Sequence, residues 1–304
     1  MKKILILLWA FQSALFFTMA QEGTVDSSHN LDSKILKRPM SYSVYLPPDY
    51  HTSKRDYPVL YLLHGMTGDH TDWTIKGETA QIADRAINSG EAPPMIIIMP
   101  DGLNDAFYIN NYDGSIRWED FFYQEFIPQV EKKFRIKSHR STRAIAGLSM
   151  GGYGALYHGV KHKEMFTQCY AMSAAVLTLE PVKEEGALSE FERSLALKLW
   201  GPLNKEGLPQ NYKAHSVHEM FRSMEVDKNW KDPRQILQGT GLPRIYIDCG
   251  DDDFLLSQNT DLVQVIKEKR IPFEFRVRDG GHTWEYWRTA LKTALAQAGD
   301  AFRN

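Results

Sequence analysis

The chain has 304 residues, of which 43% are hydrophobic and 24% are charged, and this composition is that of a folded globular protein and excludes a disordered chain. A formal net charge of -2 and the absence of a dense Lys/Arg stripe exclude nucleic acid as the expected partner. The length is compatible with a single α/β domain.

Residues 1–20 have the pattern of a secretory signal peptide. Two lysines precede an apolar run over residues 4–17, and a short segment ending in Ala20 follows. An uncleaved membrane anchor is the alternative, but Gln12 and Ser13 interrupt the run, which is shorter than the roughly 20 residues that a span needs. We therefore expect cleavage after Ala20, a secreted or periplasmic protein, and no membrane span in the mature chain.

Residues 21–40 are polar and predict a leader into one catalytic domain over residues 41–304. The first expected strand alternates polar and apolar residues and ends before Pro47, as an antiparallel strand near a sheet edge does. The later strands are uniformly apolar, which is typical of burial on both faces. Their alternation with helices predicts an α/β fold, with a mostly parallel central sheet covered by helices on both faces. The expected strands lie at 40–46, 58–63, 95–99, 144–146, 168–172, 245–248 and 273–277, and the expected helices at 78–88, 118–134, 151–162, 255–269 and 285–302.

Residues 175–240 interrupt this alternation. They combine several aromatic residues with many charges and predict a mostly helical insertion near the carboxyl edge of the sheet. One interpretation is a lid or pocket wall over the active site. The other is a peripheral helical layer whose aromatic side chains are buried.

The two cysteines, Cys169 and Cys249, each end an apolar run. A framework of disulfides needs more cysteines than this. Two buried free thiols are therefore expected, with a single bridge between them as the alternative.

The pentapeptide Gly147-Leu148-Ser149-Met150-Gly151 has the G-x-S-x-G pattern of a nucleophile elbow. At ordinary residue frequencies this pattern arises by chance in about one chain of this length in ten. Its position between an apolar strand and a glycine-opened helix is the stronger signal, because a sharp strand-to-helix turn presents a serine hydroxyl to a base. We expect Ser149 to be the nucleophile.

An α/β-hydrolase needs an acid and then a histidine after the nucleophile in the chain. His282 follows a Gly-Gly loop at the end of the last expected strand and is the expected general base. The acid is one of four clustered aspartates, Asp248, Asp251, Asp252 and Asp253. The same cluster raises a calcium site as an alternative, but it lacks the ligand spacing of a calcium loop, so no metal is expected.

The tetrahedral intermediate of acyl transfer needs backbone N–H donors for its oxyanion. One expected donor is the N–H of Met150, directly after the nucleophile, and the other is the N–H of Met66 in the loop after the strand at 58–63. His64 and Gly65 precede Met66 and are candidate binding residues. A structural role of His64 in shaping this loop is the favoured interpretation.

Four motifs together resemble the esterase D group of α/β-hydrolases and, within it, carbohydrate esterase family 1, which includes feruloyl and acetylxylan esterases. The resemblance runs from about Tyr42 to Phe302. It implies that the acid is Asp253, which holds the fourth place of the family pattern G-x-x-D-x-L. Family members often have Asp after the catalytic histidine, where this chain has Thr283, and this departure concerns the pocket wall. The motifs are Y-L-L-H-G at 61–65, G-L-S-M-G-G at 147–152, G-D-D-D-F-L at 250–255 and G-H-T-W-E-Y-W at 281–287.

The resemblance implies two-step acyl transfer with neither a metal nor an organic cofactor. Together with the signal peptide, it implies feruloylated or acetylated xylan oligosaccharides as substrates, and feruloyl ester hydrolysis is the first expectation. Tyr153, Trp284 and Trp287 are candidates to flank an aromatic acid, with simple packing as the alternative. The rival functions are an acetylxylan esterase, an S-formylglutathione hydrolase, a mycolyl-type acyltransferase and, from a different class, a non-catalytic carbohydrate-binding relative.

Overall fold

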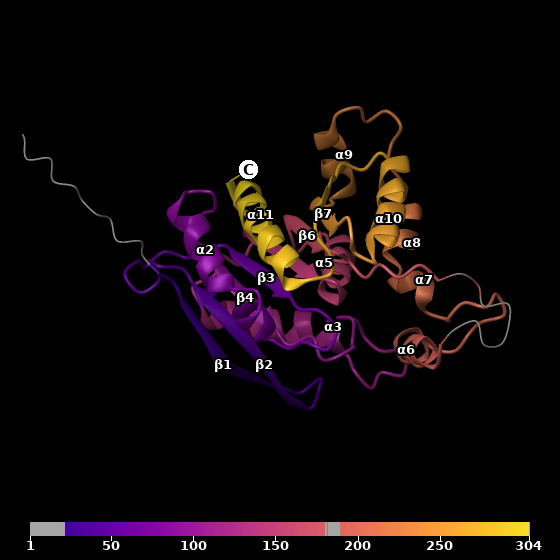
Figure 1. The fold of residues 1–304 in the computed structure, drawn as a ribbon, viewed down its shortest axis with the longest axis horizontal. Coiled ribbons are helices and arrows are strands. Elements are labelled where there is room, and N and C mark those ends of the chain that lie inside the picture. The colour runs from indigo at the N-terminus through magenta and orange to yellow at the C-terminus, as the bar shows by residue number, and fades with distance from the viewer. Residues whose placement is uncertain (1–21, 180, 182–188, 304) are drawn as a thin grey trace, which may run out of the picture.

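The computed structural model describes residues 22–179, 181 and 189–303, so the predicted signal peptide lies outside the described residues. Eight strands form one sheet in the order β1-β2-β4-β3-β5-β6-β7-β8 (Figure 1). β2 runs antiparallel to both of its neighbours, and all other neighbouring strands are parallel. The predicted α/β fold with a mostly parallel central sheet is confirmed. The strands are β1 (Thr24–Ser33), β2 (Arg38–Leu46), β3 (Val59–Leu63), β4 (Ile96–Pro100), β5 (Arg143–Leu148), β6 (Gln168–Met172), β7 (Arg244–Gly250) and β8 (Glu274–Arg278).

Helices cover both faces of the sheet, with α2 and α11 on one face and α5, α8 and α10 on the other (Figure 1). Within the described ranges no helix is long and apolar enough to cross a membrane. The helices are α1 (Asp72–Ile75), α2 (Thr79–Asn88), α3 (Trp118–Phe121), the π-helical η1 (Phe122–Phe126), α4 (Ile127–Lys133), the 3-10 segment η2 (Arg140–Thr142), α5 (Met150–Lys161), α6 (Glu190–Trp200), α7 (Tyr212–His215), α8 (Val217–Arg222), α9 (Pro233–Thr240), α10 (Leu256–Glu268) and α11 (Trp284–Arg303).

The apolar strands supply two cores at once. In β3, Val59, Tyr61 and Leu63 belong to the core under α5, whereas Leu60 and Leu62 belong to the core under α11. Successive side chains of a strand point to opposite faces of the sheet. A strand buried on both faces must therefore be apolar at every position, as β3 is.

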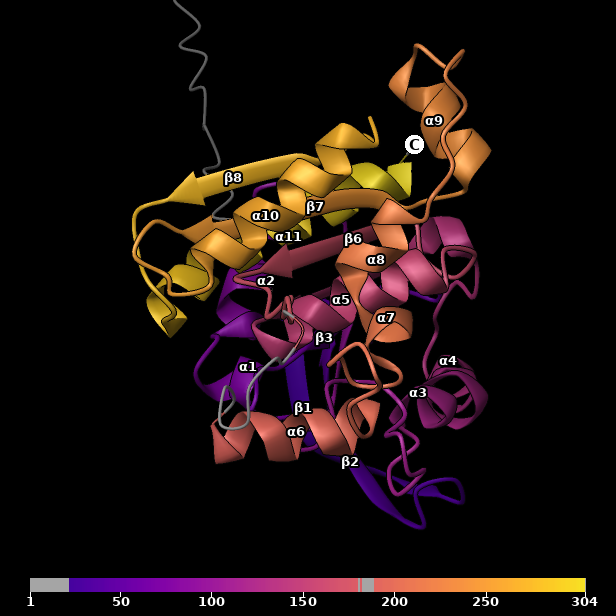
Figure 2. The same ribbon diagram turned by 90° about the vertical axis from the view of Figure 1, so that its right-hand side faces the viewer.

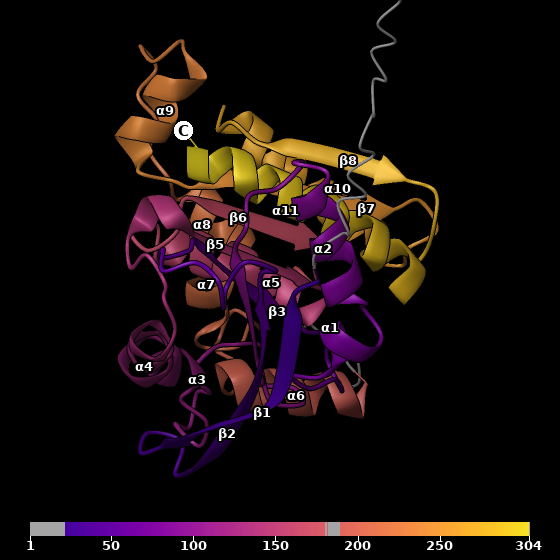
Figure 3. The ribbon, with the colours of Figure 1, turned by 90° about the vertical axis from the view of Figure 1, so that its left-hand side faces the viewer.

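β1 corrects the expectation that residues 21–40 are only a polar leader. The strand pairs with β2 along its length, from Thr24 opposite Leu46 to Ser33 opposite Arg38, and forms one edge of the sheet (Figure 3). An edge strand has one neighbour, and most side chains of β1 are at least partly exposed. Polar residues are tolerated there, so no apolar pattern marks the strand. The folded unit thus begins before residue 41.

β8 lies at the opposite edge, and its expected burial on both faces is wrong. All five of its side chains are at least partly exposed. Charged residues at 274, 276 and 278 alternate with Phe275 and Val277 along β8, and the strand lies at the edge of the sheet beside β7 (Figure 3).

The predicted helical insertion between β6 and β7 is confirmed and contains α6, α7, α8 and α9. α8 packs against α5 and α10, and Trp200 and Phe221 are buried, as in a peripheral helical layer (Figure 2). α7 lies against the first turn of α5, where the Tyr153 hydroxyl donates to the carbonyl of His215 at 2.8 Å. The insertion therefore adjoins the segment that carries Ser149, and its function as a lid stays a prediction.

Both cysteines are buried and free. Cys169 lies on β6 and Cys249 on β7. Burial raises the pKa of each thiol to about 12. At neutral pH both are protonated and act as apolar core side chains.

Candidate active site

Ser149 lies at the sharp turn between β5 and α5, with φ 52° and ψ -117°. A non-glycine residue adopts such a positive φ only at a cost, which is typical of a nucleophile elbow. The turn is tight enough to need its two glycines. A Cβ on Gly147 would lie 2.3 Å from the carbonyl oxygen of Gly151, and a Cβ on Gly151 would lie 2.4 Å from that of Leu63. The elbow thus presents the serine hydroxyl at the carboxyl end of β5.

The structure brings Ser149, His282 and Asp253 together in one hydrogen-bonded chain. Nε2 of His282 lies 3.0 Å from Oγ of Ser149, and Nδ1 of His282 lies 2.9 Å from Oδ2 of Asp253. The three residues follow β5, β7 and β8, whose carboxyl ends share one edge of the sheet. A hydroxyl, an imidazole and a carboxylate in this order have the geometry of a nucleophile, a general base and an orienting acid.

Asp253 is buried yet stays ionised. Burial acts to raise the pKa of its carboxyl, but hydrogen bonds from His282 and from the backbone N–H of Leu255 at 2.9 Å, together with the nearby Ser173 hydroxyl, hold the pKa below its ordinary value. An ionised carboxylate next to Nδ1 fixes the proton on that nitrogen. Nε2 is then free to accept the proton of Ser149.

His282 is held between two aromatic side chains. The ring of Trp287 meets it edge to face at 4.8 Å between centroids, and the ring of Phe254 lies at 4.7 Å. Trp287 is buried, and Trp284 packs between it and Trp73 at 5.3 Å from each. These contacts agree with simple packing, the alternative to flanking an aromatic acid, for both Trp284 and Trp287. Phe254, which is 73% exposed, was not singled out by the sequence.

His64 has a structural position in the loop after β3. Its Nδ1 lies 2.8 Å from the carbonyl oxygen of Gly65, and its Nε2 accepts the backbone N–H of Gly102 at 2.7 Å. These two hydrogen bonds let the His64 ring join the loop after β3 to the loop after β4. The ring is 1% exposed, which leaves it no surface for substrate.

The same loop runs against the elbow. A Cβ on Gly65 would lie 2.7 Å from Cδ1 of Leu148 and 3.6 Å from the Cβ of Ser149. Met66 follows directly, and its side chain is 38% exposed. The backbone N–H groups of Met66 and Met150 thus belong to two segments that flank Ser149, as the predicted oxyanion site requires.

Tyr153 is a packed wall residue. Its ring stacks on Tyr157 and meets Phe107 edge to face, and its hydroxyl is engaged by the carbonyl of His215. It lines a cavity of about 10 Å³ together with Trp200 and other residues of the insertion. This volume holds no more than about one water molecule. An aromatic acyl group does not enter this cavity without movement of its walls.

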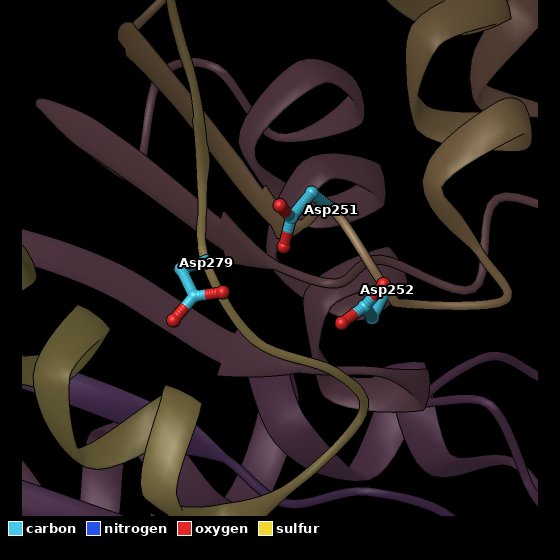
Figure 4. A group of neighbouring side chains, drawn as sticks. All are labelled: Asp251, Asp252 and Asp279. Atoms are coloured by element: carbon cyan, nitrogen blue, oxygen red, sulfur yellow. The ribbon is translucent and has the colours of Figure 1, made fainter.

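Three aspartates beside the site form an acidic cluster. Asp251 and Asp252 follow β7, Asp279 follows β8, and their carboxylates approach one another across the two loops (Figure 4). All three are exposed, and Asp251 accepts the backbone N–H of Gly280 at 2.9 Å. The cluster lies next to Asp253 in sequence, but among the described residues it forms no hydrogen bond or ion pair with His282.

Comparison with known proteins supports an esterase. The model of the family Esterase, described as "Putative esterase", matches residues 33–298. A solved ferulic acid esterase is 35% identical, with a TM-score of 0.75, and the match covers 93% of this chain and 99% of that chain. The acetyl esterase of Caldicellulosiruptor saccharolyticus is 27% identical over 284 residues, which are 88% of this chain and 95% of that protein.

A further relative is the endo-1,4-beta-xylanase/feruloyl esterase of Xylanibacter ruminicola, 33% identical over 153 residues, which are 48% of this chain and 21% of that protein. The family match spans most of the chain, and the fold and the elbow agree with it. The chain is a carboxylic-ester hydrolase and belongs to the esterase D-like α/β-hydrolases of carbohydrate esterase family 1.

Proposed function

We propose that the protein is a feruloyl esterase, which releases hydroxycinnamic acids from plant cell-wall polysaccharide, with Ser149, His282 and Asp253 as its catalytic triad. The observation that carries the proposed chemistry is the unbroken hydrogen-bonded chain from the Ser149 hydroxyl through His282 to Asp253. A serine hydroxyl becomes a nucleophile only when a base takes its proton, and this chain supplies both the base and the group that orients it.

In the first half of the reaction, Oγ of Ser149 attacks the ester carbonyl carbon while Nε2 of His282 takes the hydroxyl proton. The negative charge moves to the carbonyl oxygen, which accepts hydrogen bonds from the backbone N–H groups of Met66 and Met150. The bond to the sugar oxygen then breaks, and His282 returns the proton to the leaving alcohol. The product of this half is an ester of the acid with Ser149.

In the second half, water replaces the sugar alcohol. His282 takes a proton from the water as its oxygen attacks the acyl carbon, and the bond to Oγ of Ser149 breaks as the proton returns to the serine. Asp253 stabilises the imidazolium in both halves, and its lowered pKa keeps it ionised. The steps proposed here use only side chains and backbone of the chain itself.

The choice of acyl group and sugar rests on the relatives. The solved ferulic acid esterase is similar over nearly the whole chain, and the Xylanibacter ruminicola relative is named for xylanase and feruloyl esterase activities. We extend the proposal to a feruloylated xylan oligosaccharide as substrate and to export by the predicted signal peptide. A polysaccharide substrate outside the cytoplasm and an exported enzyme are consistent with each other.

An acetylxylan esterase is the second candidate, and two observations favour it. The Caldicellulosiruptor saccharolyticus relative is named as an acetyl esterase and matches over 95% of its length. The cavity behind Tyr153 is too small for an aromatic ring. Both candidates use the same triad and differ only in the acyl group transferred to Ser149.

A comparison of feruloyl with acetyl esters tests the proposal, and the two 4-nitrophenyl esters in it share one leaving group. The value of kcat/KM for feruloylated arabinoxylan oligosaccharides should exceed that for acetylated xylo-oligosaccharides by about tenfold or more, and 4-nitrophenyl ferulate should be preferred to 4-nitrophenyl acetate. A preference for both acetyl esters would replace the proposal with an acetylxylan esterase. Failure to hydrolyse any of the four esters would contradict the proposed site.

A further inference from the structure

Ser173 lies directly after β6 in a conformation that serine adopts at a cost. Its φ is 46°, in the left-handed region where glycine or asparagine is favoured, and its side chain is completely buried. Its backbone N–H donates to the carbonyl of Asp248 at 2.7 Å, so the turn itself is held by the backbone. The hydroxyl is not needed for that turn, which indicates that it has another function.

The hydroxyl of Ser173 lies between the indole and the acid of the active site. Nε1 of Trp287 donates to Oγ of Ser173 at 3.2 Å. An indole N–H is only a donor, so it takes one lone pair of the hydroxyl and leaves the hydroxyl proton free. The Ser173 hydroxyl acts to lower the pKa of Asp253 and of the Cys249 thiol, so both of these groups lie near it. An ionised carboxylate is the stronger acceptor for the proton.

Trp287 carries the link from Ser173 to the base. Its ring packs edge to face on His282, and its N–H anchor on Ser173 fixes the orientation of that ring. We propose that Ser173 is a positioning residue of the ester hydrolysis, which holds Asp253 through its hydroxyl proton and His282 through the indole of Trp287. This inference rests on the proposed function, because it assigns Ser173 a task in the triad chemistry.

Two substitutions separate the hydroxyl from the strained backbone. Ser173→Ala removes the hydroxyl and keeps the Cβ at positive φ, whereas Ser173→Gly removes the hydroxyl and also relieves the strain. Both variants should lower kcat by about tenfold with little change in KM, because the proposed loss is of geometry and not of substrate contact. Trp287→Phe keeps a ring against His282 and removes the indole N–H, and it should have a smaller effect that is not additive with Ser173→Ala.

The pH profile gives a readout that a purely structural serine would not move. The titratable groups around Ser173 are Asp253 and Cys249, with His282 beyond Trp287. Loss of a donor to the ionised carboxylate disfavours that form, so the acid limb of kcat/KM should move to higher pH by about half a pH unit in both Ser173 variants. The matched control is Ser43→Ala on β2, a completely buried serine whose hydroxyl donates to Ser27 at 2.8 Å far from the site.

The measurements are kcat, KM and the pH profile with 4-nitrophenyl acetate and 4-nitrophenyl ferulate, and thermal unfolding of each variant. The expected result is a lowered kcat and a shifted acid limb in both Ser173 variants, with neither change in Ser43→Ala. Wild-type kcat and pH profile in Ser173→Gly would overturn the proposal, because that variant also lacks the hydroxyl. Should the Ser173 variants fail to fold, the double variant of Trp287→Phe and Asp253→Asn would be measured instead. Additive losses of kcat in that variant would contradict the proposed link through Ser173. A wild-type protein that hydrolyses neither ester would instead contradict the proposed function.

Discussion

The ring of Phe254 lies 4.7 Å from the imidazole of His282, inclined by 51°, and 73% of the phenylalanine is exposed. His282 returns its proton to the leaving alcohol in the proposed mechanism, so the sugar must pass beside this imidazole. An exposed aromatic face at that place is suited to pack against the C–H face of a sugar.

We therefore expect Phe254→Ala to lower kcat/KM for feruloylated arabinoxylan oligosaccharides by about fivefold, mainly through KM. Methyl ferulate has no sugar, and its kcat/KM should change by less than about twofold. Phe254→Tyr is the matched control, since it keeps the ring and should retain the wild-type values. Equal losses on both esters would show that the ring serves His282 and not the sugar.

Removal of the nucleophile should abolish turnover without unfolding the protein. Ser149→Ala removes the hydroxyl at an elbow that the backbone and two glycines define, so kcat should fall by a factor on the order of 10⁴ to 10⁶ while thermal unfolding is unchanged. Stopped-flow release of 4-nitrophenol should also lose its burst. Near-normal turnover would place the nucleophile elsewhere.

The assignment of the acid has a control in the neighbouring residue. Asp253→Asn removes the charge that orients Nδ1 of His282 at 2.9 Å, and kcat should fall by roughly 10³ to 10⁴. Asp252→Asn makes the same chemical change one residue earlier, on an exposed side chain of the acidic cluster. It should change kcat by less than about twofold. A larger loss of kcat in Asp252→Asn than in Asp253→Asn would indicate that Asp252 is the catalytic acid.

Sequence patterns predicted most of the fold for a physical reason. Strands buried on both faces are apolar, and the sequence therefore predicted the central strands β3, β4, β5, β6 and β7. The edge strand β1 is held by backbone hydrogen bonds and carries polar residues such as Ser28 and Asn30, so the sequence did not predict it. Ser149 and His282 were predicted because each follows a strand, whereas Asp253 was chosen among four clustered aspartates only by its place in the family pattern G-x-x-D-x-L. Ser173 also follows a strand directly, and that position was the available signal for it. Its contact with Trp287, however, spans 114 residues and exists only in the folded chain.

A buried ion pair fixes the end of β8. The guanidinium of Arg278 donates to Oδ2 of Asp248 at 2.5 Å, and the aspartate is completely buried, with Tyr170 as a second donor at 2.6 Å. Arg278→Met should lower the free energy of unfolding by about 3 to 5 kcal/mol, because the aspartate loses its cation. Arg276→Met on the same strand breaks an exposed pair with Glu274 and should cost less than about 1 kcal/mol. Urea unfolding at neutral pH measures both losses of unfolding free energy. Equal losses in the two variants would contradict the predicted difference between the buried and the exposed ion pair.

Acid should destabilise the protein through a buried histidine on α5. His158 is completely buried, its Nε2 lies 2.9 Å from the carbonyl oxygen of Tyr108 and its Nδ1 lies 3.1 Å from the hydroxyl of Tyr123. Burial, together with the charges of His162 and Lys161, lowers the pKa of His158 to about 3, although Glu119 opposes the shift. At pH 5 the histidine is thus neutral in the folded protein and protonated in the unfolded chain, whose histidine has its ordinary value of 6.5.

A depressed pKa contributes stability that is present above the unfolded value and is lost as the pH falls toward the folded value. His158 should therefore account for a loss of about 2 kcal/mol of unfolding free energy between about pH 7 and pH 5. In His158→Gln the fall over this interval should be smaller by about this amount, although the variant starts from a lower stability at pH 7. His51→Gln, at an exposed histidine, is the control and should keep the wild-type slope. Urea unfolding at a series of pH values measures the slopes, and parallel curves for wild type and His158→Gln would show that His158 does not govern this loss.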